Sequence, residues 1–410
     1  MSKIIARAAM LALSLCLIAV ITACDRNAVS QADDTLTIGV AVYDPDSAEM
    51  QMFANYYRDY IAEGFSVKFY FSDRLTSAED EQEFIRAMKA QDADGILSFF
   101  GNDIQPVLET CAEEELWYVL GSGTLSDEDF AAADENPWFL GTVGPAPEEE
   151  TRAGEDMAAY FWEQGARRIL LLTGGAAQSN YMHYARAQGA LRTLAQRSGA
   201  ALPMAEEEIL LTGENLTFSL GEASITVSPG YYTRESDRPS IDEALNAGTF
   251  DAVLGVYDLN DLLNRIGGKE NALGHNIAVG MVDCFSEQNF RNFRASDAYG
   301  NSSVDYLEGK YASMAGPAFA ALYNAVAGDL DVVSPDGKAF RLHQDFWTAR
   351  GRDEFSELYG YTTGIYENAY SCADLMTVIR TYQPDADYDA FAALTEASDV
   401  PSVRARILSR

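Results

Sequence analysis

Residues 36–71, LTIGVAVYDPDSAEMQMFANYYRDYIAEGFSVKFYF, switch between two apolar patterns. Residues 36–43 form a short, nearly continuous apolar run, which is typical of a strand buried on both faces. In the next segment apolar side chains recur every three or four positions, the spacing of one helix face. They are Met52, Phe53, Tyr56, Tyr57 and Tyr60. Residues 67–71 are again strand-like, so the stretch predicts a parallel strand–helix–strand unit.

The same alternation continues along the chain. Further strands are expected at residues 95–100, 117–120, 168–172, 251–257 and 276–281. A stretch rich in Gly, Pro and acidic residues, 121–144, separates the first group of strands from the second. We therefore predict an α/β fold of two doubly wound parallel-sheet lobes, in which a ligand would lie beyond the carboxyl ends of the strands.

The charge of the chain restricts its partners. The 410 residues include 63 acidic and 29 basic side chains, which gives a formal net charge of −34. A surface this acidic repels polyanions, so we expect no nucleic-acid partner. The hydrophobic content of 48% is ample for packed cores and excludes wholesale disorder.

The N-terminus has the pattern of an export signal. Lys3 and Arg7 precede an apolar run over residues 8–21, which is about as long as a signal-peptide core and short for a membrane-spanning helix. The run ends in Ile21-Thr22-Ala23-Cys24, which resembles a bacterial lipobox. That resemblance implies removal of residues 1–23 and attachment of a diacylglyceryl group, with palmitate among its acyl chains, to the sulfur of Cys24. The alternatives are an ordinary signal peptide or a retained membrane anchor.

If the lipobox is used, residues 24–34 form a polar tether, and the body of the protein faces the extracytoplasmic side of a membrane. Cleavage and lipidation would leave three cysteines, Cys111, Cys284 and Cys372, without a C-x-x-C spacing. They predict neither a disulfide framework nor a zinc site. We expect no metal and no cofactor.

Sequence motifs of catalysis are missing. The chain has no G-x-S-x-G, H-E-x-x-H or P-loop pattern, and it has only three histidines, far apart in sequence. We therefore expect a binding protein rather than an enzyme. Catalytic residues can assemble in space without a motif, so a surface lipoprotein hydrolase stays as an alternative.

A series of short motifs in the second half carries a family resemblance. Residues 150–160, ETRAGEDMAAY, are followed by Gly165, the strand 168–172 and Arg186-Ala187-Gln188-Gly189. Two strand ends follow, DAVLGVYD at 251–258 and VGMVD at 279–283. In this order the motifs resemble the type I periplasmic binding proteins of bacterial sugar ABC transporters, and the likeness spans about residues 35–345. Tyr257 departs from the asparagine usual in the family.

The resemblance implies that Arg186, Asp258 and Asp283 contact the ligand, together with the substituted Tyr257. Asp258 and Asp283 each end a strand, and a carboxylate accepts from two hydroxyls while a guanidinium offers a fixed donor fork, which suits a polyol. The alternative is a structural ion pair between Arg186 and one of the aspartates.

In the first lobe the resemblance rests on position rather than on residue identity. It implies ligand contacts from residues that end the first and third strands, namely Tyr43, Asp44, Phe100 and Asp103, and from Tyr299 in the expected crossing at 295–303. Aromatic faces there could stack on a sugar. A core or hinge role is the alternative for Tyr43, Phe100 and Tyr299.

The family pattern also implies a domain layout with three crossings between the lobes. We expect the first lobe at 35–122 plus 304–338, and the second at 145–295 plus 339–410. A hairpin insertion at about 213–240 and a helical C-terminal extension, 346–410, are assigned to the second lobe. The crossings are expected near 122–144, 295–303 and 339–345, with a helix over 305–328 and another over 366–377.

Together these features predict a monomeric, lipid-anchored solute-binding protein. It would capture a small polar ligand, expected to be a sugar, by hinge closure. It would then deliver this ligand to an ABC permease. A nucleoside, an amino acid or an amine are alternative ligands. A sensing role for a membrane kinase or chemoreceptor is an alternative function. A transcription regulator is disfavoured, because no helix-turn-helix precedes the first strand.

Overall fold

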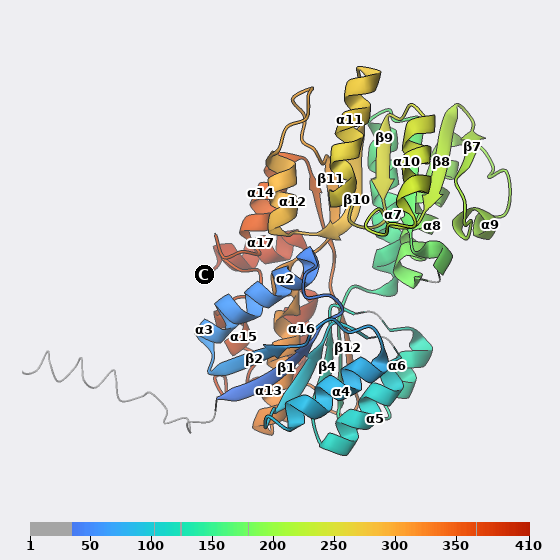
Figure 1. The fold of residues 1–410 in the computed structure, drawn as a ribbon. Coiled ribbons are helices and arrows are strands. Elements are labelled where there is room, and N and C mark those ends of the chain that lie inside the picture. The colour runs from blue at the N-terminus through green and yellow to red at the C-terminus, as the bar shows by residue number, and fades with distance from the viewer. Residues whose placement is uncertain (1–34, 102, 124, 179, 366) are drawn as a thin grey trace, which may run out of the picture. The chain divides into compact units, whose positions relative to one another are not determined.

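Buried strands form two separate sheets in the computed structural model (Figure 1), one of six and one of seven strands. The structure describes residues 35–101, 103–123, 125–178, 180–365 and 367–410. The predicted signal peptide, the tether and Cys24 lie outside the described residues. The two-lobed α/β fold predicted from the sequence is confirmed.

The first sheet has the strand order β12-β5-β4-β3-β1-β2. Its strands are β1 (Leu36–Ala41), β2 (Val67–Phe71), β3 (Gly95–Ser98), β4 (Trp117–Gly121), β5 (Phe139–Gly144) and β12 (Phe340–His343). Strand β1 pairs with β3, β3 with β4, β4 with β5, and β5 with β12, all in parallel. Every residue of β3 and β5 is buried, as expected for strands covered on both faces.

Helices cover both faces of this sheet. In Figure 1, α4 and α5 lie on one face and α13 on the other. The helical elements of this lobe are α2 (Ala48–Asn55), the π-helix η2 (Tyr56–Ile61), α3 (Ala62–Gly64), α4 (Ala78–Lys89), α5 (Ile104–Glu114), α6 (Asp127–Ala133), η5 (Ala312–Ala315), α13 (Gly316–Ala327) and η6 (Leu330–Val332).

The second sheet has the strand order β13-β11-β10-β9-β6-β8-β7. Its strands are β6 (Arg168–Gly174), β7 (Leu216–Leu220), β8 (Ala223–Pro229), β9 (Ala252–Gly255), β10 (Ala278–Cys284), β11 (Tyr306–Lys310) and β13 (Trp347–Arg350). The inner strands run parallel, and the two edge strands, β7 and β13, pair antiparallel with their neighbours.

The helices of this lobe also lie on both faces, with α7 and α8 on one and α10 and α11 on the other (Figure 1). They are α7 (Pro147–Glu163), η3 (Ala176–Gln178), α8 (Tyr181–Ser198), α9 (Glu206–Leu210), α10 (Arg238–Ala247), η4 (Asn260–Leu262), α11 (Leu263–Leu273), α12 (Glu287–Arg294) and α14 (Arg352–Gly360).

Three strands correct the predicted layout. Strand β5 lies inside 121–144, which was expected to be a crossing, and it belongs to the first sheet. Strand β11 lies at the start of 305–328, where a helix was expected, and it pairs with β10 of the second sheet. Only the later part of 304–338 therefore packs on the first lobe. Strand β12 was assigned to the second lobe, but it pairs with β5.

The crossings therefore differ from those expected. The chain leaves the first sheet after β5, at about residues 145–146, and returns to it between β11 and α13. It leaves again after β12, between residues 343 and 347, which overlaps the predicted crossing at 339–345. The expected crossing at 295–303 is wrong, because both α12 before it and β11 after it belong to the second lobe.

The hairpin predicted in the second lobe is present, since β7 and β8 pair antiparallel around residues 221–222. It is more than an insertion, because β8 also pairs in parallel with β6 and so extends the main sheet. The hairpin thus forms the outer edge of the lobe.

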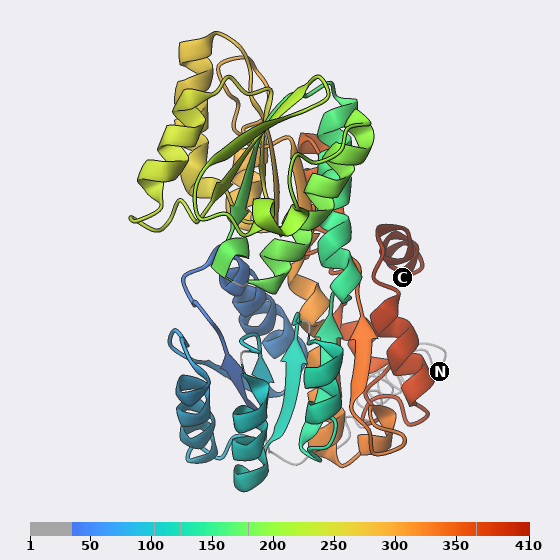
Figure 2. The same ribbon diagram turned by 90° about the vertical axis from the view of Figure 1, so that its right-hand side faces the viewer.

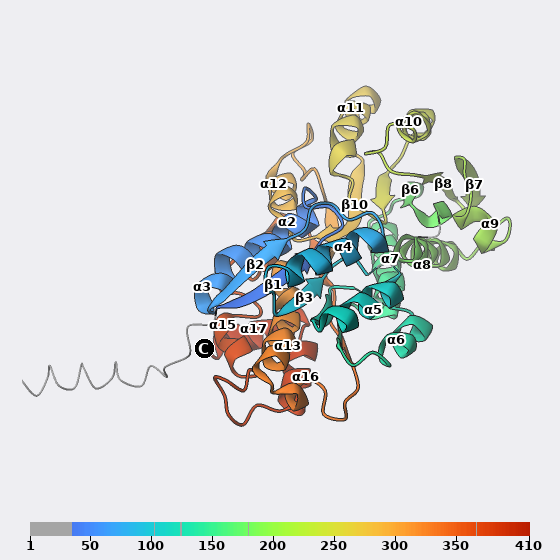
Figure 3. The ribbon, with the colours of Figure 1, turned by 60° about the horizontal axis from the view of Figure 1, so that its bottom comes forward.

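The C-terminal extension is helical but does not belong to the second lobe alone. Its helices are α14, α15 (Cys372–Met376), α16 (Tyr388–Glu396) and α17 (Val400–Leu408). Helix α14 packs on β13 and α12, whereas α15 and α16 pack on α13, and α16 lies beside β12 (Figures 2 and 3). The expected helix over 366–377 is shorter, because residues 367–371 precede α15 and are not helical.

Two glycines let helices α7 and α8 approach closely. A Cβ atom on Gly154 of α7 would lie 1.8 Å from the Arg186 carbonyl oxygen of α8. A Cβ atom on Gly189 of α8 would lie 2.1 Å from the Thr151 carbonyl oxygen of α7. Backbone thus meets backbone at this crossing, and no larger residue fits without a shift of one helix.

We predict that Gly154→Ala lowers the free energy of unfolding by about 1–3 kcal/mol, because overpacking forces the helices apart. Gly268→Ala in α11 is the matched control, since no atom lies within 4 Å of the Cβ position there. The control should be neutral or stabilising by up to about 1 kcal/mol, because alanine favours helix. Urea unfolding of both variants checks this, and equal stabilities would contradict the close crossing.

Candidate functional site

Two carboxylates stand together at the carboxyl edge of the second sheet. Strands β9 and β10 are parallel neighbours, with Gly255 opposite Met281, so Asp258, just after β9, and Asp283, the second-last residue of β10, lie at the same edge of the sheet. Such strands lie about 4.8 Å apart. An Asp258 carboxylate oxygen accepts from the backbone N–H of Asn260 at 2.7 Å. An Asp283 oxygen accepts from the Asn289 side-chain amide at 2.5 Å. The structure thus brings these two predicted residues together.

The surroundings of this pair disfavour its charged form. Burial raises the pKa of Asp258 to about 6, although its side chain remains exposed to solvent. Burial and repulsion from Asp258 raise the pKa of Asp283 to about 8. A protonated carboxyl there can donate as well as accept a hydrogen bond.

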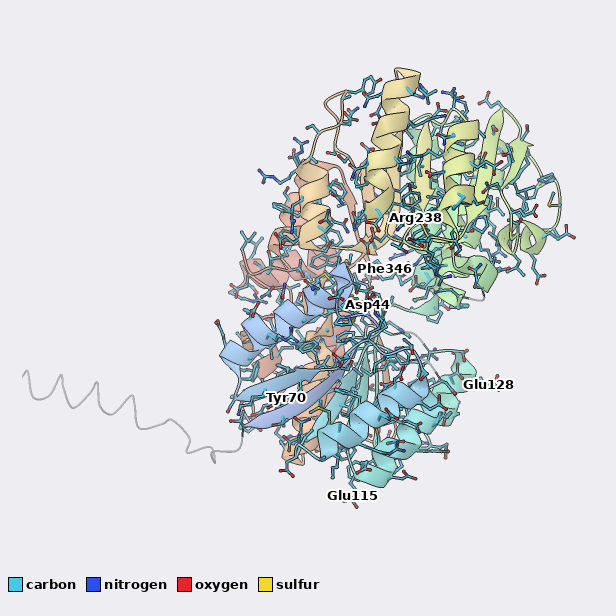
Figure 4. All side chains as sticks on the ribbon, viewed as in Figure 1. Asp44, Tyr70, Glu115, Glu128, Arg238 and Phe346 are labelled. Atoms are coloured by element: carbon cyan, nitrogen blue, oxygen red, sulfur yellow. The ribbon has the colours of Figure 1, made fainter. Side chains whose placement is uncertain are left out.

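Arg186 of α8 is buried and already paired. Its Nε lies 2.5 Å from an oxygen of Glu150, which is wholly buried in α7, and its Nη1 donates to the Val256 carbonyl oxygen at 3.0 Å. The guanidinium also lies 5.9 Å from the ring centre of Phe346, which Figure 4 labels. A structural ion pair therefore exists, as the sequence left open, but its partner is Glu150 and not an aspartate. Among the described residues, no hydrogen-bond partner of Nη2 is found.

An aromatic group lies beside Arg186. The rings of His183, Tyr231 and Tyr257 have centres 5.1 to 5.8 Å apart. The Gly175 backbone N–H donates to His183 Nδ1 at 3.0 Å, so we assign the proton of the neutral imidazole to Nε2. Burial, Arg186 and Arg234 lower the pKa of His183 to about 3. His183 is therefore an uncharged hydrogen-bond donor at neutral pH.

One ion pair connects the two lobes next to these groups. Lys310, at the end of β11, donates to Glu49 of α2 at 2.8 Å, and both side chains are largely buried. The Tyr43 hydroxyl donates to the other Glu49 oxygen at 3.1 Å. Burial raises the pKa of Glu49, but Lys310, Tyr43 and Arg186 together lower it by more than burial raises it. The net shift of this pKa is therefore downward. Glu49 also raises the pKa of Asp283, which places α2 of the first lobe against the strand ends of the second.

The remaining predicted residues of the first lobe line the carboxyl edge of its sheet. Asp44 forms an ion pair with Arg74 at 2.7 Å (Figure 4). Phe100 is half-buried, and its backbone N–H donates to the Ser98 hydroxyl. Asp103 is exposed just before α5. The described contacts of these three residues do not connect them with Asp258 or Asp283.

The structure does not bring Tyr299 together with the other predicted site residues. Its hydroxyl donates to the Glu270 carbonyl oxygen at 3.3 Å, and the Glu270 carboxylate accepts from the N–H of Ile277, just before β10 begins. Asp283 lies near the other end of β10, a strand of seven residues and so about 20 Å long. Tyr299 is therefore at the opposite edge of the sheet from the paired carboxylates.

The sequence gave no role to Glu49, Lys310, Glu150, His183 or Asn289, all of which belong to the site or support it. Glu150 stood inside the quoted motif, but nothing in its spacing from Arg186 signals an ion pair. A role for Lys310 could have been predicted only if β11 had been recognised as a strand, but these residues were expected to be helical.

Some site types are not found in the described residues. No group of three or more His, Cys, Asp or Glu side chains there is suited to holding a metal ion. Within the same ranges, no helix combines the length and apolar character needed to cross a membrane. Cys111, Cys284 and Cys372 are free thiols, the first two of them buried.

Comparison with known proteins gives similarity in structure only. No protein-family model and no curated protein sequence matches the chain. Among solved structures, it is similar to a galactofuranose-binding protein with 15% identity and a TM-score of 0.55, over 80% of this chain and 99% of that one. It is also similar to a periplasmic solute-binding protein of an ABC transporter from Actinobacillus succinogenes with bound D-allose, with 11% identity and a TM-score of 0.56, over 78% and 99% of the two chains.

A transcriptional regulator in complex with cellobiose is similar as well, with 17% identity and a TM-score of 0.52, over 77% of this chain and 84% of that one. At these identities the likeness concerns the fold, which transport proteins and regulators share. The chain thus has the fold of the type I periplasmic binding proteins.

We predict that Arg186→Met lowers the free energy of unfolding by about 3–5 kcal/mol, because it leaves Glu150 buried without a partner. The double change Arg186→Met with Glu150→Met should cost less than the single one, since no charge is then buried alone. Arg192→Met in the same helix removes an exposed pair with Glu206 and should cost less than about 1 kcal/mol. Urea unfolding of the three variants tests this. A double variant with a lower free energy of unfolding than Arg186→Met would contradict it.

Proposed function

We propose that the protein is an extracytoplasmic solute-binding protein that captures a small polar ligand, a sugar, between its lobes and delivers it to an ABC permease. One observation carries the proposal. Groups from both lobes converge on the same strand ends, because Glu49 of α2 is paired with Lys310 of β11 and acts electrostatically on Asp283 of β10. A ligand at this place would touch both lobes.

The side chains suit a polyhydroxylated molecule. Asp258 and Asp283 can each accept hydrogen bonds from neighbouring hydroxyls. His183 Nε2 and Arg186 Nη2 are donors at the same edge of the second sheet, and the ring of Tyr257 packs beside His183. Such a mixture of acceptors, donors and aromatic faces is what a sugar ring requires.

Hinge closure follows from where the groups are attached. The lobes are joined by short segments near residues 145 and 345 and between β11 and α13. A ligand that contacts residues of both lobes stabilises the arrangement in which those residues are close, which is the differential affinity that closure needs. The closed form would then be the state that a permease recognises. Sugar-binding neighbours of the same fold support this function.

We further propose that Cys24 is lipidated and anchors the protein to the outer side of a membrane. The proposal rests on the lipobox-like Ile21-Thr22-Ala23-Cys24 after a basic and then apolar N-terminus. The polar residues 25–34 would separate the lipid from the folded body.

For the ligand, we predict that at least one monosaccharide of a panel including D-allose and L-arabinose raises the melting temperature of the chain from residue 25 onward. A ligand at 100 times its Kd adds about 2.7 kcal/mol to stability. Asp258→Asn should weaken binding at least tenfold, about 1.4 kcal/mol, whereas Asp385→Asn, on an exposed part of the extension, should not change it. A panel in which no sugar produces a shift would refute the sugar assignment.

For the anchor, we predict that the full-length chain, expressed in a bacterium fed an alkyne-tagged palmitate, becomes labelled and sediments with membranes. Cys24→Ser should abolish the label and release the protein, because the sulfur is the site of attachment. Cys16→Ser, inside the segment to be cleaved, is the control and should leave the label unchanged. Labelling that survives Cys24→Ser would disprove the lipobox assignment.

A further inference from the structure

We propose that the ligand carries a protonated amino group beside its hydroxyls, and that Asp258 and Asp283 receive this group. The inference rests on the proposed function, since it concerns the same site. It narrows the ligand class from sugars in general to amine-bearing polyols.

The first support is that the two carboxylates belong to the carboxyl ends of neighbouring strands and have no cation beside them. Their hydrogen bonds come from neutral donors, the Asn260 backbone N–H and the Asn289 amide. Among the described residues, no lysine, arginine or histidine forms an ion pair with either aspartate. Two acidic groups on adjacent strand ends thus lack the counter-charge that partly buried carboxylates normally have.

The second support is that the nearby cations are already neutralised. Arg186 is paired with Glu150 and Lys310 with Glu49, so each pair carries no net charge. Neither Glu49 nor Glu150 can release its partner without leaving a largely buried charge alone. The net charge left for a ligand to meet is that of the two aspartates.

The third support is Asn289, which is wholly buried in α12 and whose amide lies against Asp283. Its nitrogen donates to Asp283 and to the Cys284 carbonyl oxygen, which fixes the orientation of the amide. Its oxygen has no hydrogen-bond donor in the described part of the chain. An unsatisfied acceptor therefore adds to the negative potential at this point, and an ammonium group offers three donors and no acceptor.

The energetics favour a cation over a neutral hydroxyl. Burial and then Asp261 raise the pKa of Asp258 to about 6, and burial and repulsion from Asp258 raise the pKa of Asp283 to about 8. A bound ammonium relieves this repulsion, whereas a neutral hydroxyl does not. The other titratable or charged groups that act on the pair are Glu49 of α2, Asp261 of η4 and Cys284 of β10, with Arg186 and Lys310 in their ion pairs.

The pH dependence follows directly. An ammonium ligand needs ionised aspartates, so its affinity should rise between pH 6 and pH 8 as the pair loses its protons, by up to about tenfold per proton and pH unit. A neutral sugar gains nothing from this ionisation, and its affinity should stay flat or fall. The two kinds of ligand therefore separate by the sign of their pH dependence.

The test compares matched pairs of probes by titration calorimetry at pH 6, 7 and 8. The probes are the 6-amino-6-deoxy derivatives of D-glucose, D-galactose and D-allose, each against its parent hexose. We expect at least one amino sugar to bind tenfold or more tightly than its parent at pH 8, with the ratio shrinking toward pH 6. In the double variant Asp258→Asn with Asp283→Asn the preference and its pH dependence should disappear.

Folding of the variants is checked independently. The pKa of Asp283 is about 8 in the folded protein, whereas an aspartate in the unfolded chain has a pKa of about 4. The contribution of Asp283 to the free energy of unfolding is therefore fully present below pH 4 and is lost as the pH rises toward 8. Asp283→Asn should therefore unfold in urea with less pH dependence than the wild type between pH 4 and pH 8, and it should be no less stable at pH 8.

The outcomes separate the two proposals. A parent hexose that binds as tightly as its amino derivative at pH 8 overturns the present inference and leaves the sugar-binding function in place. If neither the amino sugars nor their parent hexoses bind, both the present inference and the sugar-binding function are overturned. An amino-sugar preference that persists unchanged in the double variant also refutes the role of Asp258 and Asp283.

Discussion

The buried ion pair between Arg186 and Glu150 holds the second half of the site in place. It joins α7, the first helix after the chain leaves the first sheet, to α8, and through Val256 it reaches the end of β9. Glycines at the crossing of α7 and α8 allow the pair to form, because the two backbones meet there. Breaking a buried pair costs several kcal/mol, so Tyr257 and Asp258, which follow Val256, inherit a fixed position.

The ion pair between Glu49 and Lys310 has a different role, because its members belong to different lobes. Neither side chain is wholly buried, and the tyrosine hydroxyl of Tyr43 shares the same carboxylate. Any movement of α2 away from β11 stretches this bond, while a ligand between the lobes would compete for or reinforce it. If a ligand binds between the lobes as proposed, the state of Glu49 would link its binding to the distance between the lobes.

The sequence predicted the parts of the fold that depend on local pattern. Buried strands such as β3 and β6 were visible as apolar runs, and Asp258 and Asp283 were placed at strand ends, where the structure has them. Strands β5, β11 and β12 were missed, because each is four to six residues long and carries glycine or charged residues within its apolar pattern. Without β11, the contact between Lys310 and Glu49, 261 residues apart, had no basis in the sequence.

Site residues show the same division between local and long-range information. That Arg186 lies near a strand end follows from a family resemblance, but the direction of its guanidinium depends on Glu150, which a one-dimensional pattern does not pair with it. Tyr299 shows the limit of a prediction that rests on position alone. It was placed by analogy in position, whereas the loop that carries it folds back on α11 at the far edge of the sheet.

The C-terminal extension adds a constraint that the three crossings alone would not impose. Phe355 of α14 stacks on Phe285 and Phe293 of the second lobe, with ring centres 5.0 and 4.3 Å away. Further along, the Tyr370 carbonyl oxygen accepts from the Tyr56 hydroxyl of the first lobe at 2.7 Å. The extension is thus fixed to both lobes, and its last helix returns to the second lobe, where Arg404 of α17 pairs with Glu357 of α14 at 2.6 Å. The closure proposed above would therefore have to preserve or break these contacts of the extension.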